Sequence, residues 1–357
     1  MDTSDETIFI TGFPGFIAGR LVERLARGSG AFYLLVEPRF IEKALKDCEE
    51  ISARTGANLE KFAIVEGDIT KPNLGISPED LKVIRAETTH IYHLAAAYDL
   101  AVPQSVAFAV NLEGTQNVNE FARSLPNLQK YNYISTCYVA GKREGRILET
   151  ELEHHEGFRN YYEETKYLAE IEVERMKADL PVTIFRPSVV VGDSRTGEIP
   201  KYDGIYSLIH YLRKAPSLLR LVNVGNSSVT LNLVPVDFVV EAIVALGNDE
   251  NSIGKTIALA DPSPLTTKEL FDTIAESMTG KGSMLTPPPA LVKWGLSRSF
   301  SPPLTGLPLS GVPYFFISQS YDTSVAMELL SSHGIDCPGF RDYVGNLLNF
   351  VEKNPAL

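Results

Sequence analysis

The sequence predicts an α/β protein in which a doubly wound parallel sheet is followed by a smaller C-terminal α/β part. Over the first 190 residues, short runs rich in β-branched residues alternate with longer helical patterns, which is typical of βαβ units. A glycine-rich turn directly follows the first of these runs, as it does in nucleotide-binding sheets. The length of 357 residues allows two domains, which we place at 1–190 for cofactor binding and 191–357 for substrate binding.

Each expected strand is a short apolar run bounded by turn residues. After Pro187 the alternation weakens, and two later pieces, Asn232–Leu246 and Leu265–Thr279, are expected to add sheet and helix, partly by returning to the first domain. A last helix is expected over Phe340–Glu352. The strands of the first domain are expected at Thr7–Thr11, Phe32–Val36, Phe62–Glu66, His90–His93, Gln129–Ser135 and Val182–Arg186, with helices between them.

The composition excludes several classes of function. With 33 Lys and Arg against 45 Asp and Glu, the formal net charge of −12 repels phosphate backbones, so nucleic acid is not an expected partner. The three cysteines, Cys48, Cys137 and Cys337, have neither zinc-site nor redox-motif spacing, and we expect no metal. The acidic N-terminal residues lack the pattern of a signal peptide, and no run of consecutive residues is apolar enough to span a membrane. We therefore expect a cytoplasmic protein, with a homodimer allowed.

The glycine-rich turn is the first candidate cofactor site. One glycine permits a tight turn, a second lets the backbone approach a pyrophosphate, and a helix N-terminus offers N–H groups to its charge. The pattern predicts a Rossmann-type dinucleotide site, although glycine-rich turns between strand and helix also occur in other doubly wound proteins. The turn precedes a helix expected at Arg20–Arg27 and consists of Thr11, Gly12, Phe13, Pro14, Gly15, Phe16 and Ile17.

The form of the cofactor depends on the end of the second strand. Glu37 lies about 20 residues beyond the glycines, where a carboxylate accepts hydrogen bonds from the adenosine ribose, and it favours NAD. Arg39 follows two residues later and Arg20 begins the expected helix, so either arginine could pair with the extra phosphate of NADP. The sequence leaves NAD and NADP open.

Further cofactor contacts are expected where the third and fourth strands end. Asp68, followed by Ile69, is placed to meet the adenine amino group, but a role as a turn or cap residue is equally open. His93 ends the fourth strand and is expected to be a structural hydrogen-bonding residue. The small residues after it would let the cofactor lie against the backbone of Leu94, Ala95 and Ala96.

A Tyr-x-x-x-Lys pair supplies the candidate catalytic chemistry. Tyr162 and Lys166 are i,i+4 neighbours on one face of an expected helix, so the ammonium group can favour the tyrosine anion. With 15 tyrosines in the chain, an ordinary exposed helix pair is the alternative. The fifth strand ends in Ser135-Thr136, and a hydroxyl at that carboxyl edge can hold a substrate carbonyl oxygen.

In these residues the chain resembles the extended short-chain dehydrogenase/reductase superfamily over about residues 7–192. The resemblance implies that Thr136, rather than Ser135, orients the substrate oxygen, and that Asn111 supports the proton relay. It also assigns Asn111, Tyr162 and Lys166 to the cofactor site, with Lys166 on the nicotinamide ribose. A wall beside the nicotinamide would come from Pro187, Ser188, Val189 and Val190. The motifs, in order, are Thr-Gly-x-x-Gly, Gly67-Asp68-Ile69, His93-Leu94-Ala95-Ala96, Asn111 in Asn-Leu-Glu-Gly-Thr, Ser135-Thr136, Tyr162 with Lys166, and Arg186 to Gly192.

Within the superfamily the chain is most similar to the thioester-reductase and fatty acyl-CoA reductase branch, through residues 134–141, 190–197 and 232–237. This likeness implies hydride transfer between NAD(P) and a carbonyl or acyl-thioester carbon of a hydrophobic substrate, delivered as a CoA ester or on a separate carrier protein. A nucleotide-sugar epimerase or dehydratase with tightly bound NAD and a non-catalytic NAD(P)-sensing protein remain alternatives. The apolar, proline-rich segment 285–317 is either a lid over an acyl chain or a segment packed on the first domain.

Overall fold

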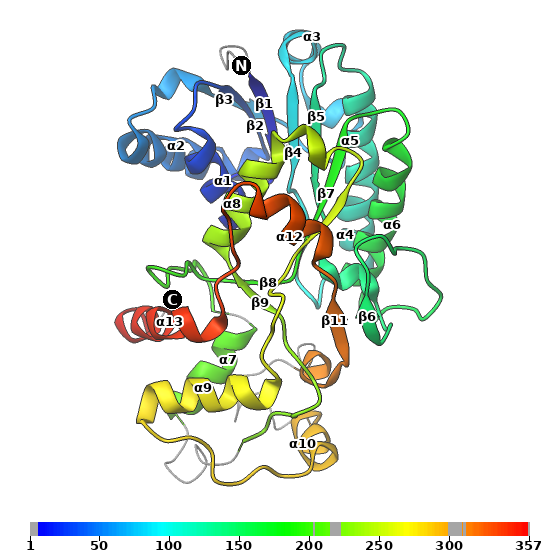
Figure 1. Ribbon diagram of the computed structural model, residues 1–357. Helices are drawn as coiled ribbons and strands as arrows, with labels where there is room; N and C mark the ends of the chain where they lie inside the picture. Colours follow the sequence, from blue (N-terminus) through cyan, green and yellow to red (C-terminus); the bar gives the residue numbers. More distant parts are fainter. Residues whose placement is uncertain (1–5, 203, 215–222, 299–308, 310–311, 356–357) are drawn as a thin grey trace.

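The computed structural model describes residues 6–202, 204–214, 223–298, 309 and 312–355. A seven-stranded sheet with helices on both faces forms the larger part, and a smaller part lies beyond the carboxyl edge of its strands (Figure 1). The predicted α/β class, a Rossmann-type doubly wound sheet, is confirmed.

All seven strands of the main sheet run parallel. Their order is β10-β7-β5-β4-β1-β2-β3, so the chain starts in the middle, fills one side and then fills the other. The direction of winding changes between β1 and β4, which is where open α/β sheets bind their ligands. The strands are β1 (Thr7–Thr11), β2 (Ala31–Val36), β3 (Phe62–Glu66), β4 (His90–His93), β5 (Lys130–Ile134), β7 (Val182–Pro187) and β10 (Thr256–Leu259).

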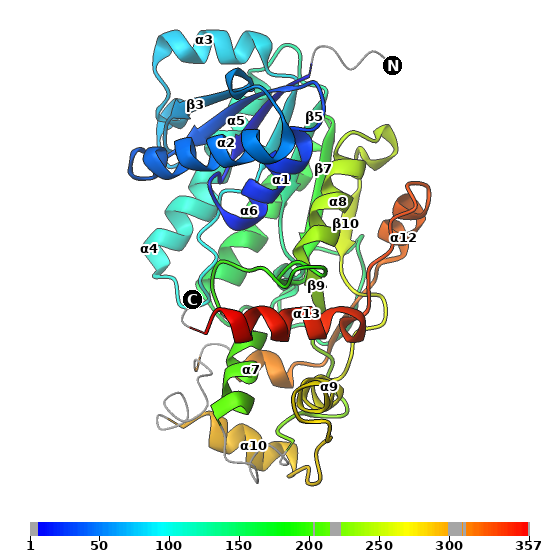
Figure 2. The same cartoon turned by 90° about the vertical axis from the view of Figure 1, so that its left-hand side faces the viewer.

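Two apolar cores hold helices against the two faces of the sheet. One core contains side chains of α1, α2, α8 and α12, and the other contains side chains of α3, α5 and α6. A third core joins α7, α9 and α13 in the smaller part (Figure 2). The helices are α1 (Phe16–Leu25), α2 (Ile41–Thr55), α3 (Pro78–Glu87), α4 (Gln104–Ala107), α5 (Gly114–Arg123), α6 (Tyr161–Met176), α7 (Ile205–Lys214), α8 (Val236–Gly247), α9 (Thr267–Thr279), α10 (Pro289–Leu296), α12 (Ser324–Ser331) and α13 (Phe340–Lys353).

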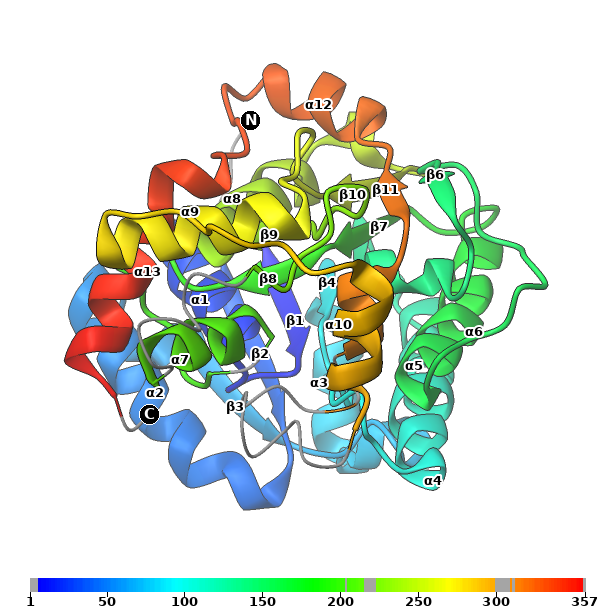
Figure 3. The same cartoon turned by 90° about the horizontal axis from the view of Figure 1, so that it is seen from below.

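Two small parallel sheets connect the larger and smaller parts. One pairs β8 (Val189–Val191) with β9 (Leu233–Pro235), and it lies between the main sheet and α9 (Figures 1 and 3). The other pairs β6 (Gly145–Ile147) with β11 (Gln319–Tyr321). Because α8 packs against α1 and β10 pairs with β7, the later half of the chain returns to the first sheet, as expected.

Some boundaries differ from the sequence-based expectation. The helix expected from Arg20 begins one turn earlier, at Phe16, because Gly15 is the extended residue that caps it. Strand β10 was not expected at all, since it has only four residues and lies in a turn-rich stretch. Its burial and its pairing with β7, which is distant in sequence, make it a strand.

Candidate active site

The glycine-rich turn lies where the winding of the sheet changes direction, between β1 and α1. Gly12 has a φ of +90°, and a Cβ there would lie 2.7 Å from the backbone nitrogen of Ala95, so only glycine fits. The N–H of Gly15 closes the turn by donating to the carbonyl of Gly12 at 2.8 Å. Gly15 has no side chain that could cap α1, so the first N–H groups of this helix suit a pyrophosphate. The turn therefore fits a dinucleotide.

The other residues of the turn divide into a buried and a surface set. Thr11 is buried, and its hydroxyl contacts Nδ1 of His93 at 2.7 Å and accepts from the N–H of Ala95 at 3.2 Å. Phe13 is also buried, and both residues support the turn from the core. Gly15 is exposed, whereas Pro14, Phe16 and Ile17 are half-buried at the start of α1.

Glu37 and Arg39 meet at the end of β2. The Nε of Arg39 lies 2.8 Å from Oε2 of Glu37, and both side chains are exposed, at 71% and 43%. The arginine also lies over the ring of Phe40. The two groups proposed to distinguish NAD from NADP are thus paired with each other.

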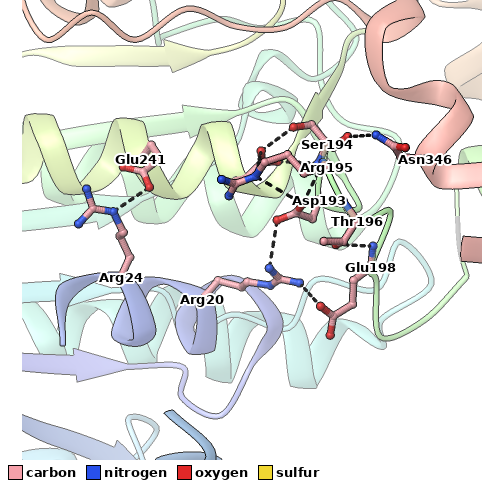
Figure 4. Close-up of polar contacts among 10 residues, drawn as sticks. Arg20, Arg24, Asp193, Ser194, Arg195, Thr196, Glu198, Glu241 and Asn346 are labelled. Carbon is pink, nitrogen blue, oxygen red and sulfur yellow. Dashed lines mark hydrogen bonds and ion pairs between the residues drawn. The ribbon is translucent and has the colours of Figure 1, made fainter. Parts of the chain in front are cut away.

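Arg20 faces a different direction. It pairs with Asp193 at 3.1 Å and with Glu198 at 2.7 Å, in the loop after β8 (Figure 4). Asp193 is buried, and its other oxygen accepts from the N–H groups of Arg195 and Thr196. Arg20 thereby joins α1 to the loop that leads into the smaller part, and a role for it at a 2′-phosphate remains a prediction.

The residues at the ends of β3 and β4 have mainly local contacts. Oδ1 of Asp68 accepts from both the backbone N–H and the hydroxyl of Thr70, at 2.9 and 2.7 Å, which is the turn role left open by the sequence. Ile69 is buried against Gly114. The backbone around Ala95 lies against Gly12, and Leu94, Ala95 and Ala96 are half-buried at the edge of the sheet.

The structure separates the two hydroxyl residues at the end of β5. The side chain of Thr136 lies close enough to Tyr162 to act on its pKa, and its Oγ1 accepts from the N–H of Tyr138 at 3.2 Å. Ser135 faces away, and its hydroxyl donates to Glu170. Burial raises the pKa of Tyr162 to about 12, and the nearby hydroxyl of Thr136 acts in the opposite direction. Thr136 is therefore the hydroxyl residue that is placed beside the tyrosine.

Glu170 belongs to a buried ion pair that the sequence analysis missed. Its Oε1 accepts from Nε and Nη2 of Arg186, at 2.8 and 2.5 Å, and neither side chain is more than 4% exposed. Burial alone would lower the pKa of Arg186, but the charge and the hydrogen bonds of Glu170, together with smaller contributions from Cys137 and Glu174, raise that pKa. In the sequence, the i,i+4 spacing of Glu170 from Lys166 on one helix was the available indication that Glu170 belongs to the site.

Lys166 contacts the strand beneath it. Its Nζ donates to the hydroxyl of Tyr133 at 2.8 Å and to the carbonyl of Ile134 at 2.9 Å. Burial lowers the pKa of Lys166 to about 7, and the charge of Glu170 limits this decrease. Tyr133 is a second residue that the sequence analysis missed. A lowering of the Tyr162 pKa by Lys166 remains a prediction.

A buried polar chain joins Lys166 to the glycine-rich turn. The hydroxyl of Tyr133 lies near Thr115, Thr115 lies 3.1 Å from Nε2 of His93, and the other ring nitrogen of His93 contacts Thr11. Burial lowers the pKa of His93 to about 3, so its ring is neutral. The chain holds the cofactor turn and the candidate catalytic lysine in one fixed arrangement.

Asn111 lies in a π-helical turn, Phe108–Glu113, that packs on α6. Its side chain accepts from the N–H of Ala97 at 2.7 Å and donates to Thr165 at 3.0 Å. Thr165 lies between Tyr162 and Lys166, so Asn111 joins the segment after β4 to the helix that carries both. The side chain is engaged in these contacts, and a place in a proton relay remains a prediction.

The last predicted group continues from β7 into β8. The N–H of Ser188 donates to the carbonyl of Leu259 at 3.0 Å, and its hydroxyl donates to Asn232 at 2.7 Å. Pro187 is buried, whereas Val189 and Val190 are half-buried in β8. These bonds place the segment at the carboxyl edge of β7, beside β10.

The lowered pKa of Lys166 predicts a pH dependence. Because a lysine with a pKa of about 7 loses its charge as the pH rises, kcat/KM is expected to fall above about pH 7 if the ammonium is required. Lys166→Arg keeps its charge and should lack this fall within the accessible pH range. Tyr133→Phe removes an acceptor of the ammonium, so its profile should fall at lower pH than that of the wild type.

Tyr131 provides the matched control for that profile. It is buried on the same strand, two residues from Tyr133, but its hydroxyl donates to Asn119 instead of contacting Lys166. Tyr131→Phe should therefore keep the wild-type profile. Identical profiles for Tyr131→Phe and Tyr133→Phe would contradict the role assigned to Tyr133.

Within the described residues, no group of three or more His, Cys, Asp or Glu side chains is arranged to hold a metal ion. Across the same residues, no helix is both long and apolar enough to cross a membrane.

The parallel sheet, the glycine-rich turn and the Thr136–Tyr162–Lys166 cluster define an extended short-chain dehydrogenase/reductase fold. The chain belongs to the NAD-binding family described as Male sterility protein, whose model matches residues 10–243. The superfamily and branch predicted from the sequence are confirmed.

Similar proteins agree with this assignment. The chain is 27% identical to the fatty acyl-CoA reductase wat of Drosophila melanogaster, over 68% of this chain and 54% of that protein. It is also 27% identical to human fatty acyl-CoA reductase 1, over 67% of this chain and 54% of the human protein. The chain thus spans about half the length of these relatives. Among solved structures, the terminal R domain of the myxalamid PKS-NRPS pathway matches with a TM-score of 0.83 and 25% identity, covering 100% of this chain and 93% of that domain.

A UDP-glucuronic acid 4-epimerase from Bacillus cereus also matches, with a TM-score of 0.67 and 21% identity, over 97% of this chain and 99% of the epimerase. At this identity the likeness shows the fold alone.

Proposed function

We propose that the protein is an NAD(P)-dependent reductase that transfers hydride to a carbonyl or acyl-thioester carbon of a hydrophobic substrate. The observation that carries the proposal is the proximity of the Thr136 hydroxyl to Tyr162, at the carboxyl edge of the sheet and with Lys166 one helical turn further along α6. The relatives that are fatty acyl-CoA reductases and the similar R domain support an acyl substrate.

In this reaction the nicotinamide cofactor supplies the hydride. The glycine-rich turn and the N-terminus of α1 bind the pyrophosphate. Thr136 holds the substrate oxygen, Tyr162 donates a proton to it, and Lys166 favours the tyrosine anion that results. With an acyl thioester, the hemithioacetal formed in this way returns its hydroxyl proton, breaks its C–S bond and releases the thiol, which leaves an aldehyde. The acyl group arrives as a CoA ester or on a separate carrier protein.

Turnover with NADH or NADPH against acyl-CoA esters, aldehydes and UDP-sugars tests this function. Oxidation of the reduced cofactor with an acyl-CoA ester or aldehyde, but not with a UDP-sugar, is the expected result. Conversion of a UDP-sugar without net cofactor turnover would instead identify an epimerase. Cofactor binding without turnover on any substrate would favour a sensing protein.

The preference for NAD or NADP is expected to depend on Glu37 and Arg39. Glu37→Ala removes an acceptor of the adenosine ribose and the partner of Arg39, so NADH should bind about tenfold more weakly and NADPH more tightly. Arg39→Ala should weaken NADPH selectively. Dissociation constants of both cofactors, measured by titration, provide the test.

Lys46→Ala is a suitable control, because Lys46 is an exposed cation on neighbouring α2 with a single 3.8 Å ion pair. It should leave the ratio of the two dissociation constants unchanged. Unchanged ratios in Glu37→Ala and Arg39→Ala as well would show that neither residue distinguishes the two cofactors.

Part of segment 285–317 packs beside the site. Tyr314 donates to Glu163 at 2.5 Å and accepts from Asn160 at 2.8 Å, at the start of α6. Its ring lies 4.6 Å from that of Tyr138, just after Thr136. Leu285, Leu291, Trp294 and Leu309 are exposed instead, and the predicted lid residues Phe300, Leu304 and Leu307 lie outside the described residues.

If the segment covers an acyl chain, kcat/KM should rise as methylene groups are added, by up to about 0.8 kcal/mol each while the apolar pocket lasts. A series of saturated acyl-CoA esters below their micellar concentrations measures this slope. A flat response from short to long chains would leave the segment with a packing role only.

A further inference from the structure

An exposed apolar surface lies on and next to α10. Met284, Leu285, Leu291 and Trp294 are 81%, 61%, 58% and 56% exposed. We call these four residues, together with Lys293 and Arg298, the α10 surface. Helix α10 lies at the end of the smaller part that is farthest from the main sheet (Figures 1 and 2).

The α10 surface combines exposed residues of a short, largely apolar helix with residues that lie just before and after it. Val292 is only 8% exposed and anchors α10 to the protein, whereas Leu291 and Trp294 point outward. Single exposed apolar side chains are common on protein surfaces, but several large ones gathered in one short stretch mark an interaction site.

The segment that carries this surface is basic, although the carboxylates of Asp272 and Glu276 on α9 lie beside Ser283 and Gly282. The formal net charge of the protein is −12, yet residues 277–321 contain no Asp or Glu and contain Lys281, Lys293 and Arg298. The guanidinium of Arg298 lies over the ring of Trp294 at 4.6 Å from its centroid. The guanidinium of Arg298 and the exposed indole ring of Trp294 therefore lie together at the surface.

We propose that the α10 surface docks on an anionic lipid surface, with its apolar side chains inserted at the headgroup level and its basic side chains among the headgroups. Indole rings favour the boundary between water and hydrocarbon, and basic groups are drawn to anionic lipids. A fluid lipid surface accommodates protruding side chains without a complementary groove. Because 277–321 contain no Asp or Glu, the repulsion that the remainder of this acidic chain would meet is reduced at this segment.

The docking proposal is independent of the proposed function, because it rests only on exposure and charge. Together with the proposed function, this docking would bring the smaller part of the protein to a lipid surface, next to the phase in which long acyl chains dissolve. Substrate would then reach the protein from the lipid phase as well as from water.

The sequence provides its own probe, since Trp294 is the only tryptophan of the chain. Its emission should shift to shorter wavelength when the full chain is mixed with vesicles of equal parts phosphatidylcholine and phosphatidylglycerol. The protein should also sediment with these vesicles and not with pure phosphatidylcholine. High salt should release it, because the attraction is partly electrostatic.

The double variant Leu291→Asp/Lys293→Glu should bind the anionic vesicles about tenfold more weakly or worse. Val83→Asp/Lys82→Glu is the matched control. It makes the same change in charge on α3, where Val83 is 49% exposed, and should bind as the wild type does. Thermal unfolding of both variants shows whether they are folded.

Several results would overturn the proposal. These are the absence of both the emission shift and sedimentation, equal binding to pure phosphatidylcholine, and equal losses in the two double variants. A shift that needs no vesicle and follows protein concentration would assign the surface to a second copy of the chain. A shift produced by a carrier protein or by monomeric acyl-CoA would assign it to that partner or to the substrate.

Discussion

Tyr162→Phe is expected to lower turnover by about a hundredfold or more while leaving the dissociation constant of the cofactor nearly unchanged. The substitution removes only the hydroxyl that lies beside Thr136. The substrate oxygen then has no proton donor, whereas the glycine-rich turn and the edge of β2 keep their contacts. Steady-state kinetics and cofactor titration measure the two quantities separately.

The adjacent Tyr161 offers a matched control, because it precedes Tyr162 on the same helix and is 41% exposed. Tyr161→Phe should retain full turnover. If Tyr162→Phe were as active as Tyr161→Phe, the proposed acid–base mechanism would fail, and the hydroxyl of Tyr162 would have only a structural role.

The second large effect is expected for the buried pair of Glu170 and Arg186. Glu170→Ala should lower the free energy of unfolding by about 3–5 kcal/mol, since it leaves a buried guanidinium without its carboxylate. Ser135 would lose its acceptor as well. Chemical denaturation of the wild type and the variant measures the difference.

Glu172 on the same helix is the control. It is 37% exposed and pairs with Arg175, so Glu172→Ala should cost no more than about 1 kcal/mol. The double variant Glu170→Leu/Arg186→Met should be more stable than Glu170→Ala, because it leaves no unpaired buried charge. If Glu170→Ala were as stable as Glu172→Ala, the result would show that the guanidinium of Arg186 is readily hydrated when its carboxylate is removed.

The alternation of apolar runs predicted the first six strands of the sheet to within two residues, because each of them carries a local pattern. The pattern could not reveal β10, whose four residues become a strand only through pairing with β7. The glycines likewise indicated the turn, but not that α1 begins directly after Gly15.

Within the site, the sequence could predict which residues are chemically suited to the reaction but not which partners they have. Arg20 pairs with Asp193, 173 positions away, and Lys166 contacts Tyr133, 33 positions away. Such contacts follow from the packing of α6 on β5 and of α1 beside the loop after β8. Local spacing placed Tyr162 and Lys166 together because both lie on one helix.

The late position of β10 in the chain has a consequence for synthesis on the ribosome. The edge of the sheet next to β7 stays unpaired until residues 256–259 have left the exit tunnel, long after the glycine-rich turn has emerged. During that interval β7 presents free backbone groups that can pair with another nascent chain. The cofactor-binding half therefore depends on the second half of the chain to protect it while it folds.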